Sequence, residues 1–88
     1  MQGEPSFDQL CDLFGYLPKR RPLSTPEVAE VVGVHFNTIE QYRLRGGGPR
    51  YFRPRGTRRV WYAEKDVLAW LYEGARNSTS EQPRAATA

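Results

Sequence analysis

The stretch from Thr25 to Arg45, TPEVAEVVGVHFNTIEQYRLR, constrains the fold of this 88-residue chain more than any other part. Its first half contains four apolar residues at helical spacing: Val28, Ala29, Val31 and Val32. Gly33 interrupts the pattern, because glycine readily takes the left-handed conformation that ends a helix. A second helix is expected from near His35 to about Leu44. Two short helices joined by a turn of about 3–4 residues that contains a glycine are typical of a helix-turn-helix.

Three residues mark the start of the first helix. Pro26 suits the first helical position, where a backbone N–H has no partner in any case. We therefore expect Thr25 to be the N-cap residue, whose hydroxyl accepts a hydrogen bond from a free amide. Glu27 adds negative charge at the positive end of the helix dipole. Val34, in the turn, is expected to be buried.

The second helix has two different sides. Ile39 and Tyr42 lie three residues apart and are expected to face the first helix. The other side carries polar and charged residues, namely Asn37, Glu40, Gln41, Arg43 and Arg45. At its start, His35 either caps the helix or contacts a phosphate, and the cap is favoured. Phe36 is expected to be half-buried against the first helix rather than exposed as a wedge.

Positive charge is concentrated on and after the second helix. The net charge is +3, but residues 1–18 carry three acids and no cation, whereas residues 19–65 carry eleven Lys and Arg against four acids. From Arg43 to Arg59 there are seven arginines and no acidic residue. This distribution indicates an anionic partner, and arginine suits phosphates and base edges better than lysine does.

Composition argues against several classes of protein. No run approaches the roughly 20 apolar residues of a membrane span, and the N-terminus lacks a signal-peptide pattern. The single cysteine, Cys11, cannot form an internal disulfide and fits a reducing cytoplasm. One cysteine and one histidine do not make a zinc site, and no acidic residue is placed to orient His35 in a catalytic triad. We therefore predict a single small domain that is not an enzyme and has no catalytic residues, metal or cofactor.

Two segments precede the helix-turn-helix. Apolar residues recur at helical spacing at Phe7, Leu10, Phe14 and Leu17. They predict a helix over about 6–16, capped by Ser6, which we expect to brace the domain rather than to dock on a partner. The basic segment 18–22, PKRRP, is equally compatible with phosphate contact and with a solvated connector.

A β-hairpin is predicted after the second helix. The run Gly46-Gly47-Gly48-Pro49 is a loop that cannot continue a helix. Residues 50–53 and 58–62 are predicted to be strands joined by a turn at 54–57. A hairpin in this position would be a wing, and its arginines favour DNA contact over a merely solvated hairpin.

Residues 63–74 are predicted to form the last helix, whose apolar face is expected to pack against Val28 and Ile39. This face consists of Val67, Leu68 and Leu71. The polar end of the chain is predicted to lack structure. We divide the chain into an N-terminal helix and basic linker (1–22), a DNA-binding domain (23–75) and a disordered tail (76–88).

The runs LSTPEVAEVVGV and RRVWYAEKDVLAWL, with the arginine-rich hairpin that ends in Arg-Val-Trp, resemble the excisionase-type helix-turn-helix domains of the MerR-like superfamily. The resemblance covers about residues 23–71. It implies a mainly α fold with a β-hairpin, that is, a winged helix-turn-helix, here with an extra N-terminal helix. One departure lies at His35-Phe36, where the superfamily usually has Ser or a similar cap followed by Pro or Arg.

The resemblance also implies a function. We expect a phage excisionase, or recombination directionality factor, that binds and bends double-stranded DNA at attachment sites in the bacterial cytoplasm. Copies would bind head to tail, and a phage integrase is a candidate partner. The alternative is a small phage or prophage transcription regulator. A protein-interaction adaptor that uses the helix over 6–16 is a third class, and an enzyme is the least favoured.

In this interpretation the second helix enters the major groove. Asn37 and Gln41 suit adenine, and Glu40 can accept from cytosine. Thr38 either packs internally or touches a phosphate or a thymine methyl group. Arginines of the helix would hold phosphates, and those of the wing would reach an adjacent groove. The complete set of expected DNA contacts is Thr25, His35, Asn37, Thr38, Glu40, Gln41, Arg43, Arg45, Arg50, Arg53, Arg55, Arg58 and Arg59.

Overall fold

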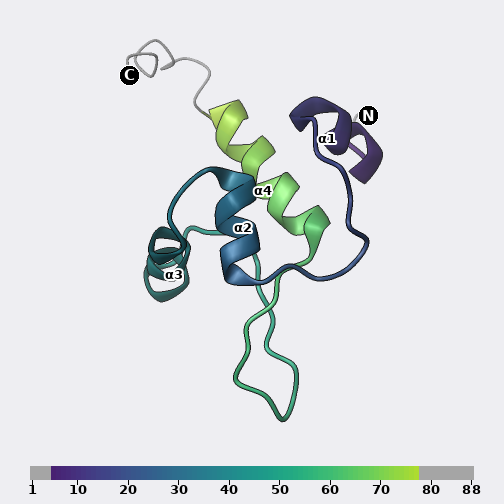
Figure 1. Cartoon of the computed structure of the whole chain (residues 1–88). Helices are drawn as coiled ribbons and strands as arrows, with labels where there is room; N and C mark the ends of the chain where they lie inside the picture. Colours follow the sequence, from purple (N-terminus) through teal and green to yellow (C-terminus); the bar gives the residue numbers. More distant parts are fainter. Residues whose placement is uncertain (1–4, 78–88) are drawn as a thin grey trace.

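Four helices account for most of the regular structure in residues 5–77, the part of the chain that the computed structural model describes (Figure 1). They are α1 (Phe7–Phe14), α2 (Thr25–Val32), α3 (Phe36–Arg45) and α4 (Glu64–Asn77). α2 packs against α3, and α1 packs against α4. The prediction of a mainly α fold is therefore confirmed. The predicted boundary between the last helix (63–74) and the disordered tail (76–88) is too early, because α4 continues to Asn77; residues 78–88 lie outside the described residues.

The first two helices begin with the same local structure. The hydroxyl of Ser24 accepts a hydrogen bond from the N–H of Glu27 (3.3 Å), and the Glu27 carboxylate accepts one from the N–H of Ser24 (2.9 Å). Ser6 and Gln9 make the equivalent capping box at α1, as the cap prediction for Ser6 requires. The prediction that Thr25 caps α2 is wrong by one residue. The N-cap is Ser24, so Pro26 occupies the second helical position. Proline is tolerated there as well as at the first position, because neither N–H has a partner inside the helix.

The turn between α2 and α3 is only partly as predicted. Gly33 ends α2 with a φ of 88°, and its N–H donates to the carbonyl of Ala29 across 2.7 Å. The prediction that Val34 is buried is wrong, since 38% of it is exposed. Its N–H also donates to the Ala29 carbonyl, at 3.0 Å. This bond belongs to the helix cap, and the capped backbone leaves the valine side chain at the surface.

Two apolar clusters meet on α4. The larger one joins α2, α3, the segment before α2 and the start of α4, and its buried members are Leu23, Val28, Ala29, Ile39, Tyr62 and Val67. The smaller one consists of Leu10, Cys11 and Leu68. The expected contact of the α4 apolar face with Val28 and Ile39 is thus correct for Val67 but wrong for Leu68 and Leu71, which belong to the smaller cluster. Consecutive helical residues point about 100° apart, so Val67 and Leu68 contact different neighbours.

α1 braces the domain, as expected, but with fewer residues than its periodicity indicated. Leu10 and Cys11 are buried against Leu68. Phe14 and Leu17 were predicted to belong to the same apolar face, yet 36% and 84% of their surfaces are exposed. α1 ends at Phe14, before the left-handed Gly15, so Leu17 is no longer on the helix.

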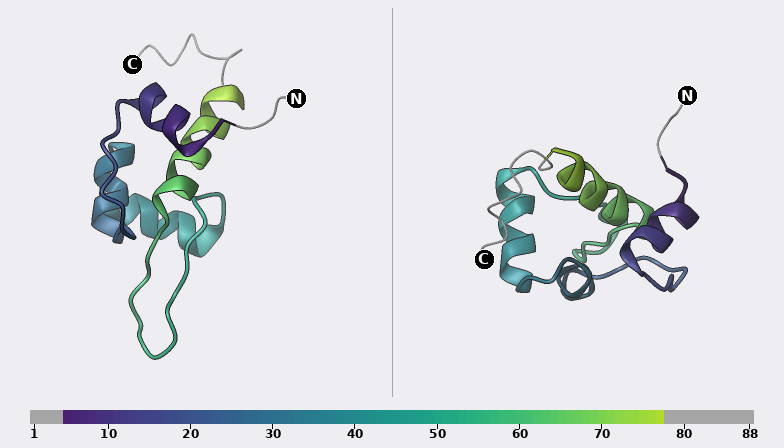
Figure 2. Two further views of the ribbon diagram at one scale, coloured as in Figure 1. Left: turned by 90° about the vertical axis from the view of Figure 1, so that its right-hand side faces the viewer. Right: turned by 90° about the horizontal axis from the view of Figure 1, so that it is seen from above.

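The chain between α3 and α4 forms a long loop that projects from one end of the helices (Figure 2). In place of the predicted strands 50–53 and 58–62, the described residues contain isolated antiparallel bridges. Phe52 and Trp61 exchange two backbone hydrogen bonds of 2.9 Å. Leu23 and Tyr62 exchange two more, of 2.8 and 2.9 Å, which attach the base of the loop to the segment before α2.

Candidate nucleic-acid interface

One side of α3 is a polar stripe open to solvent. Asn37, Gln41 and Arg45 are exposed and four residues apart, so they follow one another along the helix. Leu44 lies beside this stripe with 79% of its surface exposed, although it was not among the expected contacts. Ile39, on the opposite side, is fully buried and fixes the rotation of the helix. The stripe therefore presents two side-chain amides and a guanidinium, with the apolar Leu44 beside them.

The N-terminus of α3 is shaped by an unusual cap. Nδ1 of His35 accepts a hydrogen bond from the N–H of Asn37 at 3.1 Å, which confirms the capping role. The ring of Phe36 stacks on the histidine ring, with centroids 4.6 Å apart, and 42% of the phenylalanine is exposed. Its predicted burial is wrong because the stacked pair lies outside the core. Thr38 and Glu40 are half-buried at the margins of the exposed stripe.

Arg43 and Thr25, both expected DNA contacts, lie together beside the core. Nη1 of Arg43 donates to the hydroxyl of Tyr62 (3.1 Å) and reaches the hydroxyl of Thr25 (3.4 Å). Its guanidinium also lies 5.9 Å from the ring centre of Tyr51. Arg43 is half-buried, so it supports the structure in addition to carrying charge.

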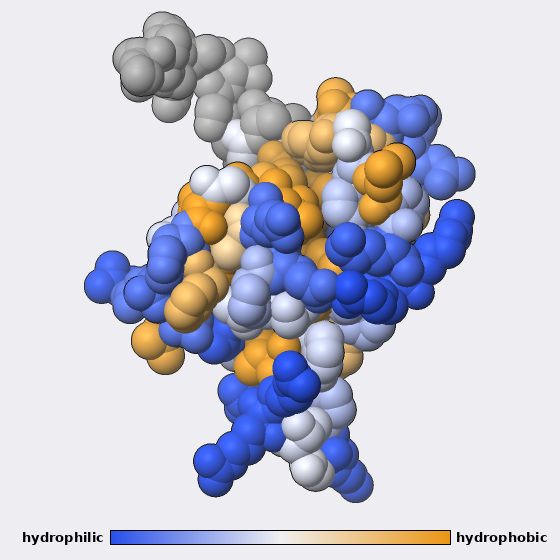
Figure 3. All heavy atoms as spheres, viewed as in Figure 1, coloured by the Kyte–Doolittle hydropathy of each residue, from blue (hydrophilic) through white to orange (hydrophobic). Residues whose placement is uncertain are grey.

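The remaining arginines of the 43–59 stretch are all exposed. Those after α3 are Arg50, Arg53, Arg55, Arg58 and Arg59. Among residues 5–74, whose side chains the structure describes, the ion pair joins Arg21 to Glu27, and these arginines have no carboxylate partner. Figure 3 shows hydrophilic residues on the flanks and tip of the projecting loop, with residues of intermediate hydropathy between them. The guanidinium of Arg59 stacks over the ring of Trp61 at 5.0 Å, which holds one of the charges near the base.

A glycine run sets how α3 passes into the loop. Gly46 and Gly47 have φ values of 92° and 95°. A Cβ at Gly48 would lie 2.6 Å from the Cβ of Tyr42, which leaves no room for a side chain. The indole N–H of Trp70 donates to the Gly47 carbonyl at 2.7 Å, and its ring meets Tyr42 edge to face. These contacts join the end of α3 to α4.

Sequence reasoning missed a buried carboxylate at the start of α4. Glu64 is 7% exposed and accepts hydrogen bonds from the Tyr16 hydroxyl and from the backbone N–H groups of Lys19 (2.7 Å) and Arg20 (2.9 Å). Burial raises the pKa of Glu64, whereas the hydrogen bonds from these three donors lower it. The donors have the larger combined effect, so the pKa of Glu64 lies below its ordinary value. Burial and the bond to Glu64 raise the pKa of Tyr16. Nothing in the local sequence separates Glu64 from an ordinary first-turn acid, because its partners lie more than 40 positions away.

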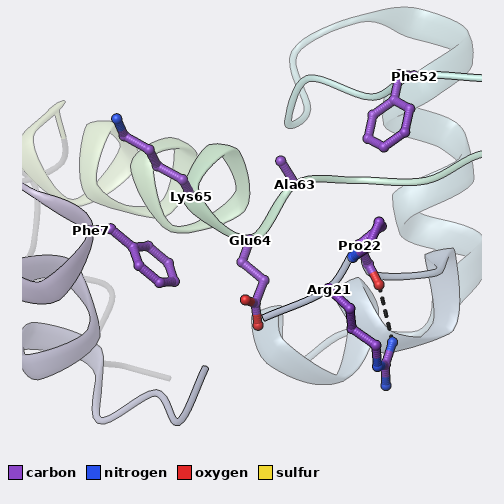
Figure 4. Close-up of a pocket in the computed structure, with 7 residues that line it drawn as sticks. All are labelled: Phe7, Arg21, Pro22, Phe52, Ala63, Glu64 and Lys65. Carbon is purple, nitrogen blue, oxygen red and sulfur yellow. Dashed lines mark hydrogen bonds between the residues drawn. The ribbon is translucent and has the colours of Figure 1, made fainter. Parts of the chain in front are cut away.

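An open, mostly apolar cleft of about 430 Å³ lies between α1, the basic segment, the loop base and α4 (Figure 4). It is lined by Phe7, Arg21, Pro22, Phe52, Ala63, Glu64 and Lys65. Over residues 5–77, no three His, Cys, Asp or Glu side chains are grouped so that they could hold a metal ion. In the same residues no helix combines the length and the apolar character that a membrane crossing requires.

Comparison of the chain with protein-family models, with curated proteins and with solved structures finds no match.

Proposed function

We propose that this protein is a DNA-binding protein with a winged helix-turn-helix, in which α2 and α3 form the helix pair and the loop after α3 is the wing. One observation carries the proposal. Of the seven arginines from Arg43 to Arg59, six are exposed and none has a carboxylate partner in the described chain. Unpaired guanidinium groups at this density favour a phosphate polymer as the ligand.

The arrangement of α3 and the loop supports the proposal. α3 lies at the side of the helical body near the base of the loop, and the loop projects beyond it (Figures 1 and 2). With the exposed stripe of α3 in a major groove, Asn37 and Gln41 would reach base edges. The loop arginines would then reach phosphates or the neighbouring minor groove. The Phe52–Trp61 bridge would be the start of the wing hairpin.

Within this function, the excisionase role depends on the sequence resemblance. Copies bound head to tail at attachment sites would bend the DNA so that an integrase favours excision. A small transcription regulator would use the same helix and wing on promoter DNA.

Titration of fluorescent 30-base-pair duplexes of mixed sequence, at several salt concentrations, tests DNA binding. If about six to eight cations each neutralise a phosphate, affinity falls by several orders of magnitude over a fourfold increase in salt. A variant with Arg53, Arg55 and Arg58 changed to Gln keeps the helices and is expected to bind weakly with a shallower salt slope. Absence of wild-type binding at low salt would contradict the proposal.

Gel shifts and footprinting on attachment-site and promoter DNA then separate the two roles. Stepwise, bent complexes on directly repeated sites support an excisionase. A single complex on an inverted repeat supports a regulator.

A further inference from the structure

The backbone of Arg20 has a φ of 60°, and it is the one residue other than glycine with positive φ among residues 5–77. Glycine takes this left-handed conformation at little cost, whereas an L side chain is strained in it. Strain of this kind persists only where the surrounding structure enforces it. Glycine would adopt this backbone conformation without strain. The presence of arginine at position 20 therefore points to a role for its side chain.

Glu64 enforces the conformation. Its buried carboxylate accepts hydrogen bonds from the N–H groups of both Lys19 and Arg20. A few residues later, Leu23 is joined to Tyr62 by two backbone hydrogen bonds. The basic segment 18–22 is thus fastened at both ends, while the side chains of Lys19 and Arg20 are exposed. The segment 18–22 therefore has a fixed backbone and is not a flexible connector.

The three cations of this segment are not equivalent. Arg21 donates two hydrogen bonds to the Glu27 carboxylate, at 3.0 and 2.6 Å, and one to the carbonyl of Pro22 at 3.0 Å (Figure 4). Its charge is balanced within the protein. Lys19 and Arg20 form no ion pair with any side chain of residues 5–74. Their charges are therefore available to an anion from outside.

The segment lies where a bound duplex could reach it. It runs past the base of the loop on the opposite side from α3, with α2 between it and α3 (Figures 1 and 2). The Leu23–Tyr62 bridge and the cleft shared by Pro22 and Phe52 place it directly beside the loop. A duplex that extends from α3 across the base of the loop would reach Lys19 and Arg20 on the far side.

We propose that Lys19 and Arg20 form a third DNA contact, to backbone phosphates that flank the duplex segment held by α3 and the loop. This inference rests on the proposed function. Glu64 is its positioning residue, because it fixes the backbone from which both side chains extend. The contact would add affinity on every sequence without reading bases.

The test uses the full-length chain and the mixed-sequence duplex. Arg20→Gly removes the guanidinium and relieves the strain, so the thermal midpoint is expected to stay unchanged or rise, while DNA affinity falls about threefold to tenfold and the salt slope drops by about one. Arg20→Lys retains the charge and should keep most of the affinity. Lys19→Gln should lower affinity in the same way. Lys65→Gln removes one exposed charge from α4, where Figure 4 shows the side chain directed away from Arg21, and serves as the matched control.

The outcomes separate this inference from the proposed function. Loss of affinity in Arg20→Gly and Lys19→Gln beyond that in Lys65→Gln supports the third contact. Wild-type affinity and salt slope in both variants would overturn it, although the wild type still binds DNA. If Arg20→Gly proves unstable, Arg20→Asn replaces it, since asparagine also tolerates the left-handed conformation. A wild type that ignores DNA would instead refute the proposed function itself.

Discussion

Nη1 of Arg43 donates a hydrogen bond of 3.1 Å to the hydroxyl of Tyr62, so an expected phosphate contact on α3 is attached to a residue that is 1% exposed. Tyr62 is in turn paired with Leu23 through its backbone. This bond orients the guanidinium and stabilises the contact between α3 and the loop base. Arg43 and Arg45 are only two residues apart on α3, yet they have different roles.

Replacing each of these arginines by alanine should separate structure from binding. Arg43→Ala is expected to lower the free energy of unfolding by about 1 kcal/mol, because it leaves the Tyr62 hydroxyl without its donor. Arg45→Ala, at an exposed position, should leave stability within about 0.5 kcal/mol of wild type. Both should weaken DNA binding and reduce the salt slope by about one. Urea denaturation and duplex titration measure the two effects, and equal stabilities would show that the Tyr62 bond contributes little.

Gln41 should read a base. Gln41→Ala is expected to cost about 1–3 kcal/mol of binding at one base position, because an amide in the major groove pairs with a single base edge. Affinities for a selected site and for its single-base variants measure this loss. Equal losses on selected and random duplexes would mean that the exposed stripe of α3 does not face the base edges.

Glu64→Gln should destabilise the domain by about 1–3 kcal/mol. The amide NH₂ group of glutamine would point a donor at a site that already holds three donors, one from Tyr16 and two from the backbone. Tyr16→Phe removes only one of those donors and should have a smaller effect. Thermal and urea unfolding of the two variants gives the comparison, and a neutral Glu64→Gln would show that the buried site admits water.

Acid should weaken the fold through Glu27. The hydrogen bonds from Arg21, followed by that from the backbone of Ser24, lower the pKa of Glu27 from 4.5 to about 2. A carboxyl with a lowered folded pKa contributes stability above its unfolded value, and this contribution is lost as the pH falls through the folded value. Unfolding free energies should therefore decline between about pH 4.5 and pH 2. Glu27→Gln should show a shallower decline, and identical pH profiles would contradict the assignment.

Gly48→Ala should be destabilising by about 1–3 kcal/mol, since the added methyl group would overlap the Tyr42 side chain. Gly74→Ala is the matched control. A Cβ at Gly74 meets nothing within 4 Å, and alanine in a helix is favoured over glycine by roughly 0.5–1 kcal/mol. Opposite signs are expected in a calorimetric comparison. A stable Gly48→Ala variant would mean that the end of α3 can shift away from the loop.

Local signals in the sequence predicted the helices well. Ser6, Gly33 and His35 act within one turn of their own positions, so their capping roles could be inferred from neighbouring residues. The error at Thr25 arose because two adjacent hydroxyl residues can both cap a helix. Arg45 and the loop arginines were expected at the surface, and they are exposed there.

What the sequence did not predict depends on distant contacts. The burial of Glu64 requires residues 16–20 to fold back on α4. The exposure of Phe36 could not be read from its apolar character, because small domains leave much apolar surface in water. The two strands failed to extend beyond single bridges for a related reason. A hairpin without a sheet or a helix beneath it gains little from burial.

The sparse pairing of the loop has a consequence for how the protein behaves alone. Between Phe52 and Trp61, the backbone hydrogen bond is that of the turn, from the N–H of Thr57 to the carbonyl of Pro54. Apart from the N–H of Arg59, which donates to the Thr57 hydroxyl at 3.0 Å, both arms therefore keep N–H and C=O groups without a backbone partner, like the edge strands through which chains aggregate. The arginines along these arms repel one another between molecules and so act as gatekeepers. Variants in which these arginines are replaced by neutral residues should self-associate more readily than the wild type. They should therefore be studied at low protein concentration.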